Sequence, residues 1–243
     1  MIAGHKPEEH AHTDEPRIPS FADPTPFTLF PLAAGSIAIS GLILGYIPKT
    51  DLPIVTIWII GVGFCLTLGG LMIIKNGDPI AGNLNLAFGV LFFIIPGVTN
   101  VIWLYGQSSI LVEAYSMATP TLIANAYIFL FLGLVLAVYI PIMASASWLF
   151  FFSLILFDIA VFGISFYDLQ PAADRATGFW NDIYKLSGFL ILVAALSMSY
   201  HGFALQLKYG FGRMILPIPG PLFSNTPEDD ENYSVHIFLI FVL

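Results

Sequence analysis

One acidic residue stands inside an apolar run that is long enough to cross a membrane. Asp158 lies near the middle of the run FFFSLILFDIAVFGISF, residues 150–166. A carboxylate is costly to place in hydrocarbon, so acids in such runs usually face the bundle interior or a water-filled path. Two interpretations stay open: Asp158 hydrogen-bonds a neighbouring helix as a structural contact, or it binds and releases protons, because burial disfavours its charged form. Leu154, one helical turn earlier, is expected on the same face.

Other residues that could carry chemistry are weaker candidates. His201 could relay protons, although a single histidine near a membrane interface is more often structural. His5, His10 and His12 lie in a polar tail, where a metal site would lack a folded scaffold. The single cysteine, Cys65, lies in an apolar run, which excludes a disulfide framework and a cysteine-based metal site. We therefore expect no metal and no cofactor.

The composition places this chain in a lipid bilayer. Of its 243 residues, 57% are hydrophobic, 15% are aromatic and only 10% are charged, with a mean hydropathy of +0.85. The 8 basic and 16 acidic residues gather in the two tails and a few short stretches. Because a nucleic-acid binder needs a basic surface, a net charge of -8 excludes that class.

Long uncharged stretches predict the membrane-spanning helices, because about 20 apolar residues cross the hydrocarbon core as a helix. These stretches are 24–48, 52–74, 79–112, 114–157 and 186–207. The fourth is long enough, with the apolar residues after it, for two spans joined by a tight turn near residues 145–147. We predict an all-α membrane protein with six transmembrane helices, at 27–47, 54–74, 84–105, 122–143, 147–167 and 186–207.

Charged tails flank this membrane domain on both sides. We expect a polar N-terminal tail over 1–22, a six-helix domain over 23–220, and an acidic C-terminal tail over 221–243 with a short apolar end. Six crossings place both termini on one side. Five of the eight basic residues then lie on that side, which favours cytoplasmic termini and a location in the cell membrane. The five are Lys6, Arg17, Lys75, Lys208 and Arg213; the other three are Lys49, Arg175 and Lys185.

Short loops and absent motifs argue against an enzyme. Most connections are only a few residues long, and the chain carries no Ser-His-Asp, HExxH, Walker or dinucleotide-binding pattern. Transport is the class that remains. Because six helices are few for two rocking bundles, a narrow path through each protomer is the simpler arrangement.

The segment KYGFGRMILPIPG, after the last predicted span, supplies the most specific motif. Its Gly212, Arg213, Leu216 and Pro217 resemble the F-G-R-x-x-L-P-x-G that closes members of the acetate uptake transporter family. This family comprises the succinate-acetate permeases and their yeast relatives.

Three further stretches agree with this resemblance in order and spacing, over about residues 23 to 220. The start of the first span resembles N-P-A-P-x-G-L, with Pro24, Pro26 and Leu29 retained and Asp23 in place of the asparagine. In the third span, Ala87 and Phe88 match an A-F pair. In the fifth, residues 151–154 match F-F-S-L.

The resemblance implies a fold, a substrate class and a set of path residues. It implies six-helix protomers in a homohexamer, each with its own path for acetate and similar small monocarboxylates, and in some members for succinate. The family narrows its path with bulky residues of the first, third and fifth spans. Carried over by motif, these positions are Leu32, Leu91 and Leu154.

Asp158 departs from the family pattern, which has an apolar residue there. An ionised carboxylate beside a dry constriction would repel an acetate anion by several kcal/mol. Transport of acetate past Asp158 would therefore be proton-coupled, as in a symporter, or proton-gated. The alternative is a hexameric channel for neutral solutes such as urea or short amides. A membrane protein that binds a partner through its acidic C-terminal tail is a third interpretation.

Overall fold

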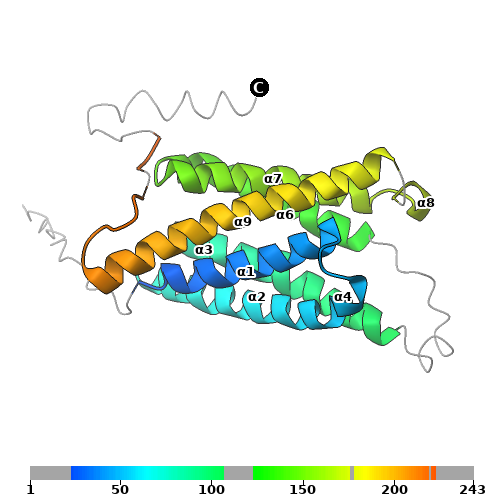
Figure 1. The fold of residues 1–243 in the computed structure, drawn as a ribbon, viewed down its shortest axis with the longest axis horizontal. Coiled ribbons are helices and arrows are strands. Elements are labelled where there is room, and N and C mark those ends of the chain that lie inside the picture. The colour runs from blue at the N-terminus through cyan, green and yellow to red at the C-terminus, as the bar shows by residue number, and fades with distance from the viewer. Residues whose placement is uncertain (1–22, 107–122, 176–177, 219, 223–243) are drawn as a thin grey trace, which may run out of the picture.

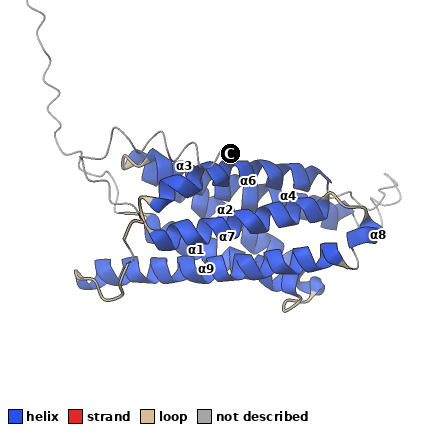
Figure 2. Cartoon of the chain, turned by 90° about the horizontal axis from the view of Figure 1, so that it is seen from above, coloured by secondary structure: helices blue, strands red, loops and turns tan. Residues whose placement is uncertain are grey.

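The computed structural model describes residues 23–106, 123–175, 178–218 and 220–222 (Figure 1). The expected N-terminal tail, 1–22, and all but two residues of the expected C-terminal tail, 221–243, lie outside this part. Within it, six helical segments are long and apolar enough to cross a membrane, and Figure 2 shows helices and loops but no strand in the described chain. The prediction of an all-α, multi-pass membrane protein is confirmed.

Each of the six predicted spans has a helical counterpart. The first five are α1 (Thr25–Leu44), α2 (Leu52–Lys75, after a short 3-10 turn at Lys49–Asp51), a composite third span (Pro79–Ala87, Phe88–Ile94 and Ile95–Gly106, labelled α3, η2 and α4), α6 (Ile123–Ala144) and α7 (Trp148–Asp168). A short helix, α8 (Ala172–Arg175), precedes the sixth span, α9 (Phe179–Phe211).

The last helix is much longer than the predicted span over 186–207. It has 33 residues, which corresponds to a length of about 50 Å, against a hydrocarbon core of about 30 Å. Asp182 and Lys185 in its first turns, and Lys208 in its last turn, are part of the helix. Charges end an apolar run without ending a helix. The helix is instead bounded by two glycines with positive φ. Gly178 precedes its first residue, and Gly212 follows its last.

The third span changes helix type at its centre. Phe88–Ile94 form a π-helix between two α-helical segments. Pro96 lies two residues after this segment. A proline has no N–H to donate and its ring clashes with the carbonyl four residues earlier, so a regular α-helix cannot run through this point undisturbed. Both Phe92 and Phe93 are fully buried. Such segments recur at functional sites, which makes this part of the span a place to look for one.

The helices pack as a single bundle with both ends of the described chain on one side. α1 lies between α2 and α9, and α7 lies between α6 and α9. Figure 1 shows the start of α1 and the end of α9 at the same end of the bundle, as expected for six crossings.

Glycines let the second and third spans approach closely. Gly63 of α2 faces Gly89 of the third span, and Gly70 of α2 faces Gly82. Within each span the two glycines are seven residues apart, so they lie on one face of the helix. A Cβ added at Gly82 would lie 2.7 Å from the carbonyl oxygen of Gly70. Small residues at such contacts are typical of membrane helices, where packing rather than water exclusion drives association.

This contact yields a stability prediction. Gly82→Ala places a methyl group against the backbone of α2, which cannot move aside as a side chain can, so we expect the thermal midpoint in detergent to fall by several degrees. Gly61→Ala is the matched control, because an added Cβ there meets no atom within 4 Å of the described structure. Its midpoint should stay the same or rise. Equal effects of the two substitutions would contradict the close approach.

Candidate functional site

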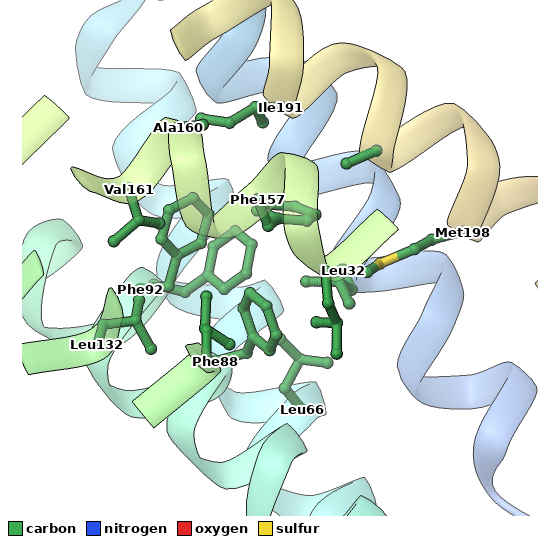
Figure 3. Packing of buried hydrophobic residues seen from close by; sticks show 14 of the residues in the cluster. Leu32, Leu66, Phe88, Phe92, Leu132, Phe157, Ala160, Val161, Ile191 and Met198 are labelled. Atoms are coloured by element: carbon green, nitrogen blue, oxygen red, sulfur yellow. The ribbon is translucent and has the colours of Figure 1, made fainter. Parts of the chain in front are cut away.

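Aromatic rings fill the centre of the bundle. Phe88 and Phe92 of the third span and Phe157 of α7 are all fully buried and contact one another edge to face. Their centroids are 5.3 Å apart for Phe88 and Phe157, 5.7 Å for Phe92 and Phe157, and 6.0 Å for Phe88 and Phe92. Figure 3 shows these rings among aliphatic side chains from the surrounding helices. At this level the interior is occupied by apolar side chains.

The structure brings two of the three predicted constriction residues into this core. Leu32 of α1 and Leu154 of α7 are buried members of the same hydrophobic cluster, and Figure 3 labels Leu32 close to the aromatic group. Leu91 is only partly buried and packs against the margin of the cluster. Phe88, three residues before Leu91, and Phe92, directly after it, supply the third span's rings at the centre. The motif match pointed to Leu91, whereas the four-residue spacing of Leu84, Phe88 and Phe92 was the sequence signal for an inward face.

Asp158 lies on the flank of α7 that faces α6. Phe162, one turn later, lies where a Cβ on Gly133 of α6 would be, and the Ser165 hydroxyl donates to the Ala126 carbonyl of α6 at 2.7 Å. Residues spaced by four and seven positions share a helix face, so Asp158 points the same way.

The environment of the Asp158 carboxyl is unusual for an acid. The residue is partly buried, and its Oδ1 is shielded from solvent without a hydrogen-bond partner among the described residues. Leu154 is fully buried one turn away, so the acid lies at the edge of the core that holds the predicted constriction. No described residue provides the structural hydrogen bond to Oδ1 that one interpretation of the sequence required.

His201 is separate from Asp158. It packs against Phe150 of α7, with 5.6 Å between ring centroids, and Phe150 lies two turns before Asp158, which is about 12 Å along the helix. The Nδ1 atom of His201 is buried and has no hydrogen-bond partner within the described chain. Across the same residues, no group of three His, Cys, Asp or Glu side chains could hold a metal ion.

Buried hydroxyls are polar features of the interior that the sequence analysis did not single out. Ser40 of α1 donates to the carbonyl oxygen of Gly188 on α9 at 2.7 Å. Ser36, one turn earlier, is fully buried, yet its Oγ has no partner among the residues that the structure describes. The spacing of Leu32, Ser36 and Ser40 by four residues was a signal in the sequence that could have placed these hydroxyls inside the bundle.

The residues of the first motif join the start of α1 to the end of α9. Pro24, Pro26 and Leu29 are buried. Asp23 accepts hydrogen bonds from the Thr25 backbone at 2.9 Å and from the Tyr209 hydroxyl of α9. A pocket of about 410 Å³ opens here, lined by Asp23, Pro26, Phe27, Gln206 and Tyr209; Asp158 is not among its lining residues.

The closing motif turns the chain back toward the loop between α6 and α7. Gly212 has a positive φ of 64°, Arg213 is exposed and Leu216 is partly buried. The carbonyl oxygen of Pro217 accepts a hydrogen bond from the Tyr200 hydroxyl at 2.8 Å. The Trp148 N–H at the start of α7 then donates to Gly220 at 3.1 Å. The motif therefore fastens the segment after α9 to two other parts of the bundle. Ala87, the remaining motif residue, is partly buried in α3.

Hydrogen bonds to the Asp23 carboxylate favour its ionised form. Partial burial acts to raise its pKa, but hydrogen bonds from Thr25 and Tyr209, with the charge of Lys208, outweigh it and hold the pKa below its usual range. A lowered pKa in the folded protein means stability that is present above the ordinary pKa of an aspartate, about 4, and is lost as the pH falls through the folded value.

Tyr209→Phe tests this link between the ends of α1 and α9. It removes one donor to ionised Asp23, so we expect the thermal midpoint in detergent to fall at about pH 7, where Asp23 is charged. At a pH below about 4 that is low enough to protonate Asp23, the gap from the unsubstituted protein should narrow, because a neutral carboxyl group accepts a weaker hydrogen bond than a carboxylate does. Tyr46→Phe, at a strongly exposed tyrosine, is the control. A gap that is equal at both pH values would show that Tyr209 acts without Asp23.

Comparison with known proteins identifies a solved structure with a similar fold. No protein-family model matches the sequence, and no curated protein matches it. Among solved structures, the chain is similar to the bacterial acetate channel SatP, with a TM-score of 0.67 and 16% sequence identity, over 82% of this chain and 99% of that chain. The six-helix bundle described above therefore shares its fold with that protein.

Proposed function

We propose that this protein moves acetate and similar small monocarboxylates across a membrane, through a path inside each six-helix protomer. The observation that carries the proposal is the match to the fold of an acetate channel over 99% of that channel's chain. The motif resemblances support it as well, because they lie at the start of α1, in the third and fifth spans, and directly after α9. We include succinate as a second substrate, a homohexameric assembly and cytoplasmic termini in the proposal on the resemblance alone.

The filled core limits how a carboxylate can cross. An unpaired anion costs far more free energy to place among apolar side chains than its neutral acid does. Phe88, Phe92 and Phe157 occupy the centre, so passage requires these rings or their neighbours to move. Hydrophobic constrictions of this kind gate channels by excluding water. We infer that the described conformation is closed and that the permeant crosses the constriction as a neutral species or together with a proton.

Asp158 is the group that would couple the path to protons. It lies beside the constriction, and its Oδ1 is shielded and unpaired within the described residues. Two negative charges at 4 Å repel each other by about 4 kcal/mol at an effective dielectric constant of 20. We propose that Asp158 is protonated when the carboxylate passes, which makes transport proton-coupled or proton-gated.

The same carboxyl favours one alternative, a channel for neutral solutes such as urea or short amides. A neutral permeant is not repelled by an ionised Asp158 and could donate a hydrogen bond to its unpaired Oδ1. Direct flux measurements distinguish this alternative from carboxylate transport.

Radiolabelled acetate and urea should be compared in proteoliposomes that contain the full chain. We expect acetate flux above that of protein-free vesicles and urea flux equal to it. Because acetate diffuses through lipid as the neutral acid, the protein-free rate is subtracted at each pH. Urea flux with no acetate flux would establish the alternative and refute the carboxylate proposal.

Asp158→Asn tests the proton link. The substitution keeps the shape of the side chain but cannot ionise, so we expect the protein-dependent acetate flux to vary less between about pH 5 and pH 8 than in the unsubstituted protein. Asp182→Asn, at an exposed position in the first turn of α9, is the matched control. Equal thermal midpoints would show that both variants fold. A pH profile that Asp158→Asn leaves unchanged would remove Asp158 from the mechanism.

A further inference from the structure

One buried hydroxyl on α1 has no structural role in the described conformation. Ser36 has an exposed fraction of 0%, and its Oγ has no partner within the described residues. Helical serines usually donate to the carbonyl four residues earlier. In this protein Ser153, Ser187 and Ser197 do so, at 2.8 to 3.0 Å, whereas Ser36 does not.

The contacts of its neighbours show where Ser36 points. Gly35 faces α2, because a Cβ added there would meet Val62 of that helix. Ser40 faces α9, through its hydrogen bond to Gly188. Leu32 and Ser36 are one turn apart on the side of α1 between these two contacts, which is the side that faces the bundle interior. The Ser36 hydroxyl therefore lies one turn from Leu32, on the same inward face.

An unpaired buried hydroxyl costs free energy that an alanine of nearly the same shape would not. Native structures contain few such groups, and each calls for a partner that the static structure does not show. The interior of this bundle is apolar around Leu32. A permeant carboxyl group that passes Leu32 would bring an oxygen acceptor into this region.

We propose that Ser36 is a specificity-determining residue, whose hydroxyl donates a hydrogen bond to a carboxyl oxygen of the permeant next to the apolar constriction. This inference rests on the proposed transport of small monocarboxylates and adds a residue to it. A hydroxyl suits the task, since it donates to a carboxylate and can also accept from the O–H of the neutral acid. It thus offers a hydrogen bond to either form.

The test compares Ser36→Ala with Ser40→Ala in the full chain. For Ser36→Ala we expect the acetate concentration at half-maximal flux to rise by about tenfold, the loss of one hydrogen bond. Its thermal midpoint should stay the same or rise, because no bond within the described structure is lost. Ser40→Ala removes the donor to Gly188, so its midpoint should fall while its half-saturation changes little.

The outcomes separate this inference from the function on which it rests. If the unsubstituted protein moves no acetate, the proposed function fails and Ser36 loses its role with it. If acetate moves and Ser36→Ala has an unchanged half-saturation, only the inference fails. A lower midpoint in Ser36→Ala would also overturn it, because that result assigns the hydroxyl a structural partner.

Discussion

The structure depends on a single physical constraint, the absence of hydrogen-bonding solvent in the bilayer core. Backbone groups must be satisfied within the protein, which is why the described spans are helices. The same constraint acts on side chains. The hydroxyls of Ser40 and Ser165 are satisfied by hydrogen bonds to backbone carbonyls of neighbouring helices. Buried polar atoms of Ser36, Thr56, Ser147, Asp158 and His201 have no partner within the described residues. Of these, Ser36 and Asp158 lie one helical turn from Leu32 and Leu154, so their lack of a partner bears most directly on the proposed path.

The bundle is tightly closed at its centre, as the proposed transport requires of a resting state. Close glycine contacts bring α2 against the third span, and Phe88 and Phe92 of that span meet Phe157 in the core. A seal of packed rings excludes water and ions without any charged group. The proposed transport requires this seal to open, and the π-helix between two α-helical segments is a local irregularity at which such a change can begin.

Within the described spans, Asp158 is the one acid that lies away from the end of a helix. Asp158 adjoins Leu154 at the edge of the core, on the flank that faces α6. A carboxylate there opposes a carboxylate permeant, whereas a carboxylic acid does not. The proposed substrate therefore requires the proposed proton link. An ionised acid beside the path would repel an anionic permeant, whereas a protonated acid would not.

The sequence by itself determined the number of spans, their helical nature and the turn between α6 and α7, because apolar length and the lack of charge are local properties. The family resemblance pointed to Leu32 and Leu154, which the structure places in the buried core; their role as a constriction stays a prediction. The length of α9 follows from the flanking glycines, which the sequence also contains, rather than from the charges used to predict its ends. Tertiary structure decided the rest. Packing against α7 and α6 decided that Phe88 and Phe92, rather than Leu91, fill the centre, and the isolation of the Ser36 hydroxyl depended on neighbours far away in sequence. Packing partners are non-local, so no pattern within one helix could reveal them.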